Sequence, residues 1–200
     1  MVGSYIMIFF SIFITSFICT DYSCQTIRNK LIVGHSRAAL YFSNFITAWI
    51  GSLVIAAAYL ITIAVLTVFL GLETGMPPNE LCFFILTQIA AVTALVSFYV
   101  LLSELITSKS KAVTTALILS LVLSIMYPIM GDMHIGFNVQ AAKVISNAIS
   151  VFFTDIMPSG QLVQMEMGAD IQRIFPVYSL AVTAASSAIG ILIFKRKGLK

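Results

Sequence analysis

The sequence predicts an all-α polytopic membrane protein with five transmembrane helices. Three observations lead to this fold class: 60% of the 200 residues are hydrophobic, 10% are charged, and the mean hydropathy is +1.03. A water-soluble domain of this length carries about a quarter charged residues, because its surface must be solvated. The missing charges indicate that lipid is the solvent, so we expect a single transmembrane domain over residues 1–200.

Five apolar stretches are long enough to cross the hydrocarbon layer as helices. A span takes about 20 residues, because unpaired backbone amides cannot be left in lipid. The second and third stretches, Phe45–Leu70 and Leu81–Ile106, are longer than this minimum, so we expect these helices to tilt or to extend beyond the interface. The predicted spans are Val2–Cys19, Phe45–Leu70, Leu81–Ile106, Ala112–Met130 and Ile174–Phe194. The first is interpreted as a retained span, since it lacks the basic start and the cleavage site of a signal peptide.

The connections between the spans alternate in charge. Segments 20–44 and 107–111 and the C-terminal tail together hold nine Lys and Arg, whereas segments 71–80 and 131–173 hold two. Cytoplasmic flanks of membrane proteins retain Lys and Arg, so the basic connections are predicted to be cytoplasmic. The C-terminus is then cytoplasmic, and five spans place the N-terminus outside. The net charge of +3 comes from a few clusters, none of which is a Lys/Arg tract that suits a nucleic acid, so no nucleic-acid partner is expected.

The long outer segment contains a helical pattern. Its apolar residues recur at helical spacing and predict an amphipathic helix at the outer interface, or dipping into it: Ala141, Ile145, Ala148, Ile149 and Phe152. A folded loop with incidental periodicity is the alternative. The turn "MPSGQ" follows, and Ser159 is expected to cap a short helix over Gln161–Met167.

Motifs that carry chemistry are missing from the sequence. It has no GxxxxGK[ST] phosphate loop, no HExxH and no GxSxG, so no catalytic residue is predicted and ATP hydrolysis would need a partner. His35 and His134 have no second ligand at metal-binding spacing, so no metal site is expected. Glu104 is the one ionisable residue found within a predicted span, near its cytoplasmic end. It is expected to pair with Lys109 or Lys111 or to cap the helix interface, and the alternative is a functional charge near the inner mouth.

The cytoplasmic segment 20–44 predicts a short helix, a sharp corner and the start of the next span. Asp21 or Ser23 can cap the short helix, and Gly34 can end it in the left-handed conformation. Ser36 can then cap the helix that enters the membrane. Ile27 and Leu31 share one face of the short helix. Such an element could anchor the chain at lipid headgroups or dock on another protein.

The stretch "TIRNKLIVGHSR", followed by "YFSN" and a long span, resembles the connection between the second and third spans of type-2 ABC exporter permeases. The order of the later segments is also similar to that family. The resemblance implies that the short helix is a coupling helix, seated in a groove of an ABC ATP-binding subunit. It implies that these residues contact that subunit: Ile27, Arg28, Asn29, Lys30, Leu31, Gly34 and Arg37.

The same resemblance implies a bacterial plasma-membrane protein that works as a homodimer or heterodimer of permease chains, surrounded by membrane lipid. This chain would bind no cofactor, because ATP and Mg belong to the partner subunit. The family usually has six spans, so the resemblance also implies that the first span is missing here.

The leading functional hypothesis is therefore the permease subunit of an ATP-driven exporter for a hydrophobic or amphipathic cargo, such as a peptide, a drug or a lipid-linked molecule. Four polar side chains of the third span are candidates for the substrate path, although each could instead bond a neighbouring helix: Gln88, Thr93, Ser97 and Tyr99. The alternative hypothesis is a non-transporting membrane protein that acts as a sensor, an immunity factor or an assembly factor.

Overall fold

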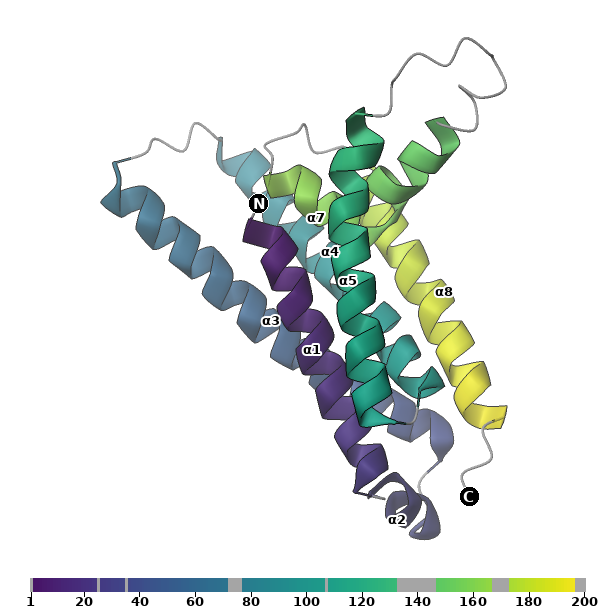
Figure 1. The fold of residues 1–200 in the computed structure, drawn as a ribbon. Helices are drawn as coiled ribbons and strands as arrows, with labels where there is room; N and C mark the ends of the chain where they lie inside the picture. The colour runs from purple at the N-terminus through teal and green to yellow at the C-terminus, as the bar shows by residue number, and fades with distance from the viewer. Residues whose placement is uncertain are drawn as a thin grey trace.

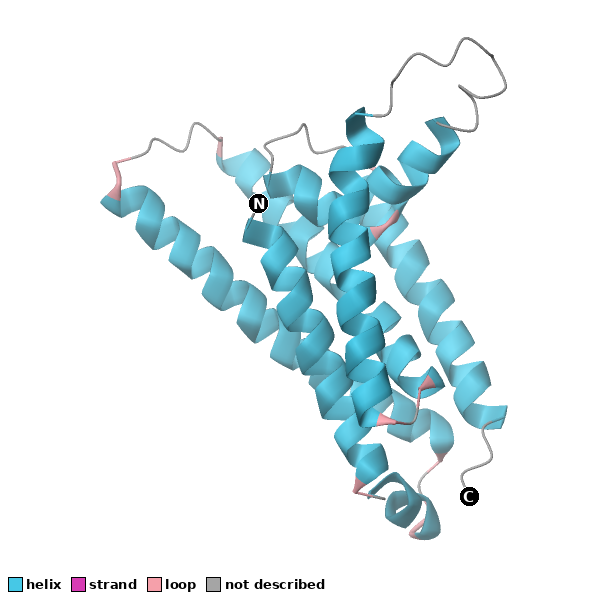
Figure 2. Ribbon diagram, viewed as in Figure 1, coloured by secondary structure: helices cyan, strands magenta, loops and turns pink. Residues whose placement is uncertain are grey.

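The computed structural model describes residues 2–24, 26–34, 36–71, 77–106, 108–132, 147–166 and 173–196. All regular structure in these ranges is helical, and Figure 2 shows no strand among them. The elements are α1 (Val2–Ser23), α2 (Thr26–Ile32), α3 (Arg37–Phe69), α4 (Pro78–Leu105), α5 (Lys109–Asp132), a π-helical turn η1 (Phe152–Ile156), α7 (Pro158–Glu166) and α8 (Phe175–Arg196). The predicted all-α fold class is confirmed.

Four helices are long and apolar enough to cross a membrane, which indicates a membrane protein. The qualifying segments are Arg37–Phe69, Asn79–Leu105, Lys109–Met126 and Phe175–Phe194. Within α1, the apolar segment Met7–Ser23 is shorter than these four. The predicted fifth span therefore stays a prediction.

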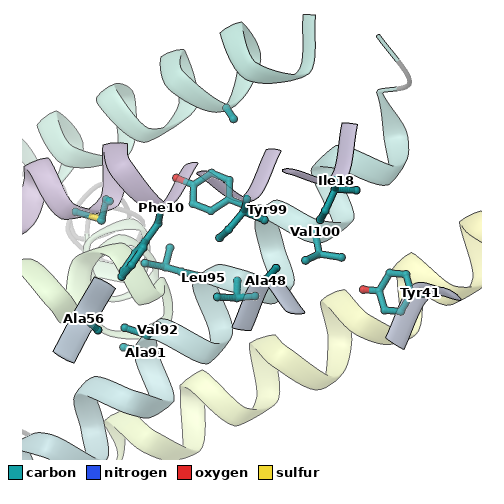
Figure 3. Packing of buried hydrophobic residues seen from close by; sticks show 14 of the residues in the cluster. Phe10, Ile18, Tyr41, Ala48, Ala56, Ala91, Val92, Leu95, Tyr99 and Val100 are labelled. Carbon is teal, nitrogen blue, oxygen red and sulfur yellow. The ribbon is translucent and has the colours of Figure 1, made fainter. Parts of the chain in front are cut away.

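Helix α4 forms the centre of the bundle and contacts α1, α3, α5, α7 and α8. Its membrane-spanning window is 44% buried, against 11% for that of α3, so α4 is the core helix and α3 is peripheral. Figure 3 shows Leu95, Tyr99 and Val100 of α4 beside Phe10 and Ile18 of α1. These side chains are all buried.

Three hydrogen bonds between side chains join α4 and α1 to their neighbours. Ser97 of α4 and Ser186 of α8 lie 2.6 Å apart at their hydroxyl oxygens. The Trp49 ring N–H of α3 donates to the Thr93 hydroxyl of α4 at 2.9 Å. Ser11 of α1 donates to Ser120 of α5 at 3.4 Å. Such bonds satisfy polar groups that lipid cannot, and they add to close packing.

Helix α3 packs along its first half and separates from the bundle along its second half. Its buried residues follow one face at steps of three or four: Leu40, Tyr41, Asn44, Ala48, Ser52 and Ala56. Ala48, Ser52 and Ala56 are the small residues of this face, and small residues allow neighbouring helices to approach closely. No α3 residue beyond Ala56 is buried. Figure 1 shows α3 diverging from the other helices toward its C-terminal end.

The described part of the predicted outer segment is also helical. Residues 147–151 form a helix that continues into η1, where the Met157 N–H donates to the Phe152 carbonyl at 3.0 Å. Ile149 and Phe152 of the predicted apolar face are each 42% exposed. Ala141 and Ile145 lie outside the described residues.

The short helix predicted over Gln161–Met167 begins earlier than expected. Helix α7 starts at Pro158, and the Gly160 and Gln161 N–H groups donate to the Met157 carbonyl. Ser159 therefore lies in the first turn and the predicted Ser159 cap is wrong, because proline already suits the first helical position. Residues 158–163 are buried, and α7 contacts α1, α4 and α5. The helix is thus inserted into one end of the bundle.

Candidate functional site

The candidate site lies at the end of the bundle where three basic features gather, which we call the basic end. It comprises α2, the connection between α4 and α5 with Lys109 and Lys111, and the C-terminal turn of α8 with Lys195 and Arg196. Figure 1 shows these elements at one end, whereas α7 and the start of α4 lie at the other. The arrangement agrees with the predicted alternation of the connections.

The corner after α2 forms as predicted. Gly34 has a φ of +102°, which an L side chain rarely adopts, and its N–H donates to the Leu31 carbonyl at 3.1 Å. The Ser36 hydroxyl accepts the Ala39 N–H at 3.2 Å and caps α3. The predicted caps at Asp21 and Ser23 are wrong, because α1 continues through Ser23. Asp21 and Ser23 are therefore part of the last turn of α1 and do not lie at the start of α2.

The two faces of α2 have different surroundings. Ile27 is 2% exposed, and Leu31 packs against the same buried cluster of the bundle. Ile27 therefore anchors α2 on the bundle, and its predicted contact with a partner subunit stays a prediction. Ile32 and Val33 are 74% and 78% exposed. Neither residue is among the predicted contacts of the short helix, although both lie just before Gly34 and off the face of Ile27.

An ion pair and a hydrogen bond from charged side chains connect α2 and α3 to neighbouring helices. The Lys30 ammonium lies 3.0 Å from the Asp21 carboxylate of α1, with both side chains partly exposed. The Arg37 guanidinium donates to the Phe194 carbonyl of α8 at 3.2 Å. Asn29 is exposed, and the Arg28 side chain lies outside the described part of the chain. Lys30 and Arg37 thus connect α2 and α3 to α1 and α8.

Two further contacts at the basic end reach α4 and α5. The Tyr22 hydroxyl of α1 donates to the buried Glu104 carboxylate of α4. The Lys109 ammonium of α5 donates to the Thr20 hydroxyl of α1 at 3.0 Å. These contacts bring Tyr22 to Glu104 and Lys109 to Thr20, and the predicted pairing of Glu104 with Lys109 or Lys111 stays a prediction. Nothing local in the sequence marks Tyr22, which is 82 residues from Glu104.

The four predicted path residues have separate surroundings. Thr93 and Ser97 are used in the hydrogen bonds from α4 to α3 and α8, and Tyr99 is fully buried in the core. Gln88 lines a cavity of about 280 Å³ between α3 and α4, and the other three residues are not in the lining of that cavity. The predicted substrate path stays a prediction.

Clusters of metal-binding side chains do not occur in the described ranges: no group of three or more His, Cys, Asp or Glu residues could hold an ion. The three cysteines form no disulfide in the described ranges; Cys19 is buried, and Cys24 and Cys82 are exposed.

Comparisons with known proteins do not assign the basic end to a family. No protein-family model, curated protein or solved structure matches the chain. The geometry of α2 and of the helices that it joins is therefore the basis for a functional proposal.

Proposed function

We propose that the chain is the permease subunit of an ATP-driven exporter, with a separate ABC ATP-binding subunit docked on α2. In this proposal the basic end and the C-terminus are cytoplasmic, the N-terminus is external, and α1 is a fifth span of a bacterial plasma membrane. Two permease chains, identical or different, form the membrane unit. ATP and Mg are bound by the partner subunits, and the cargo is hydrophobic or amphipathic.

The observation that carries the proposal is the asymmetry of α2, which is anchored on one face and bare on the other. Ile27 and Leu31 hold the helix against the bundle, while Ile32 and Val33 extend into solvent beside the exposed Asn29. An exposed apolar pair next to polar groups is typical of a surface that a partner covers. The anchored face keeps this surface in a fixed position.

The contacts around α2 support a mechanical role. Helix α2 is joined to α1 by the pair of Lys30 and Asp21, and to α3 through the Gly34 corner. Helix α1 in turn bonds α4 and α5, and α3 bonds α8 through Arg37. A displacement of α2 is therefore passed to all the long helices at the basic end. Rigid-body movement of this kind is the means by which ATP closure would alternate access to the cargo.

Capture of the ATP-binding subunit tests the proposal. The full chain is tagged, expressed in its native host and purified in mild detergent, and the co-purified ATPase activity is measured. The double variant Ile32→Asp and Val33→Asp is expected to lose this activity at least tenfold while still inserting, because the bare face becomes charged. Leu31→Asp is unsuitable, since Leu31 packs on the bundle and its loss would disturb folding.

Ser110→Asp is the control for added negative charge, because it places one carboxylate at an exposed position of the basic end, outside α2. Its place in the first turn of α5 suits a negative charge, so folding is retained. Equal capture by the double variant and by Ser110→Asp would reject docking on α2. A chain that captures no ATPase in any form would favour the alternative, a non-transporting membrane protein.

A further inference from the structure

The cavity between α3 and α4 lies where the two helices separate. Its lining comes from four α3 residues and four α4 residues: Leu53, Ala56, Ala57, Leu60, Ile85, Gln88, Ile89 and Val92. Ala56 is the last buried residue of α3, and the hydrogen bond from Trp49 to Thr93 closes the seam on the side of the basic end. The cavity is therefore bounded by packed helices on one side and adjoins the diverging half of α3 on the other.

Gln88 is the one polar residue in this lining. It is 6% exposed, and no hydrogen bond joins its side-chain amide to another described residue. A polar group left without a partner in an apolar medium costs several kcal/mol. A buried amide beside an apolar cavity is thus suited to a ligand that supplies the missing hydrogen bond.

The depth of Gln88 limits what such a ligand can be. It lies nine residues into the span that starts at Asn79, or about 14 Å along the helix axis. The hydrocarbon core is about 30 Å thick, so this position is near its middle. An ordinary lipid keeps its headgroup at the interface and brings no hydrogen-bonding group to this depth.

We propose that the α3–α4 cavity binds a compact amphipathic molecule: a short alkyl chain that carries one hydroxyl or amide group, which pairs with Gln88. The volume of about 280 Å³ is just below the range of roughly 300–1,000 Å³ that drug-sized ligands occupy, so the occupant is small. As a cargo site the cavity deepens the exporter proposal and rests on it. Binding itself needs no ATPase.

Trp49 provides a reporter for this test, because it is the single tryptophan of the chain and lies one helical turn from Leu53. The purified full chain in lipid nanodiscs is titrated with 10-bromodecan-1-ol, whose bromine quenches tryptophan fluorescence. Quenching by probe dissolved in lipid rises without saturation, whereas a site gives a saturable component. We expect a saturable component in the native chain, and its absence would overturn the proposal.

Two variants of neighbouring alanines locate the site. Ala57→Phe fills the cavity and is expected to weaken the saturable component at least tenfold. Ala58→Phe is the matched control, since Ala58 is exposed and does not line the cavity, and it should leave the component unchanged. The smaller Ala57→Leu should give an intermediate loss, which guards against misfolding of the phenylalanine variant. Equal quenching in the two phenylalanine variants would overturn the proposal.

Gln88→Leu tests the hydrogen bond with nearly constant side-chain volume. The native chain is expected to bind 10-bromodecan-1-ol about fivefold more tightly than 1-bromodecane, because one hydrogen bond is gained. Gln88→Leu should remove this preference and keep the binding of 1-bromodecane. An unchanged preference would overturn the proposal. Saturable quenching without ATPase capture would reject the exporter alone, and capture without saturable quenching would reject the site alone.

Discussion

At the scale of single residues, Gly160 shows how closely α7 is packed. A Cβ atom at this position would lie 2.0 Å from the Phe153 carbonyl oxygen and 2.7 Å from that of Thr154. Both obstructing atoms belong to the backbone of η1, so they cannot rotate away as a side chain can. The absence of a side chain at Gly160 therefore permits the turn between η1 and α7.

We predict that Gly160→Ala destabilises the protein, by about 1–3 kcal/mol or more, because α7 must move away from η1. The measurement is the apparent Tm of the detergent-solubilised chain, followed by size-exclusion chromatography after heating. Gly51→Ala is the control, since its Cβ would meet only the tip of the Phe13 ring, at 2.5 Å, and that ring can shift. Equal losses of Tm in the two variants would contradict the prediction.

At the scale of an element, α7 depends on a buried glutamine for its place in the bundle. The Gln161 amide N–H group donates to the Asp155 carbonyl, and its oxygen accepts the Ser179 hydroxyl of α8 at 2.6 Å. Gln161 is fully buried, so these bonds are not exchanged with water. Gln164, which is partly exposed, bonds only to Thr154 and Asp155 near η1.

We predict that Gln161→Leu loosens α7 and lowers stability by about 1–3 kcal/mol, because the buried Ser179 hydroxyl loses its acceptor and the Asp155 carbonyl loses a donor. The readouts are the apparent Tm and the rate of cleavage by a soluble protease in the segment 147–166. Gln164→Leu serves as the control with a smaller expected loss, since Gln164 is partly exposed whereas Gln161 is fully buried. A larger loss in Gln164→Leu would show that the Gln161 network does not hold α7.

At the scale of the whole molecule, the connections gather by charge at two ends, and the proposed orientation follows from this arrangement. The basic end holds α2 and the connection between α4 and α5. The opposite end holds α7 and the start of α4, where Asn79 is exposed. Because basic flanks are retained in the cytoplasm, the proposed orientation places the basic end of every long helix on the cytoplasmic side.

We predict that a cysteine at Ser110 is shielded from a membrane-impermeant thiol reagent in intact cells, while a cysteine at Asn79 is labelled. Both substitutions, Ser110→Cys and Asn79→Cys, are made in a chain whose three natural cysteines are replaced by serine. The two positions are exposed, so accessibility from one side of the membrane decides the result. Disruption of the cells should make Ser110→Cys reactive. The reverse pattern of labelling would invert the proposed topology.

The sequence by itself determined the elements that depend on local chemistry. Apolar length predicted the four long helices that qualify as spans, and the pair of Gly34 and Ser36 predicted the corner between α2 and α3. Ala48, Ser52 and Ala56 also recur at intervals of four in the sequence, a spacing that suits the close-packed face of α3. These features follow from composition and from the backbone preferences of a few neighbouring residues, so they can be predicted without knowledge of the tertiary contacts.

Only the tertiary structure decided which faces are covered and which polar groups meet. The sequence places Ile27 and Ile32 on different faces of one short helix, but only the packing shows that Ile27 is the buried one and Ile32 the exposed one. The bond between Tyr22 and Glu104 joins positions 82 residues apart, and the isolation of Gln88 beside a cavity depends on where α3 leaves α4. In a chain that is apolar nearly throughout, burial is set by the packing of helices against one another, and hydrophobicity alone does not report it.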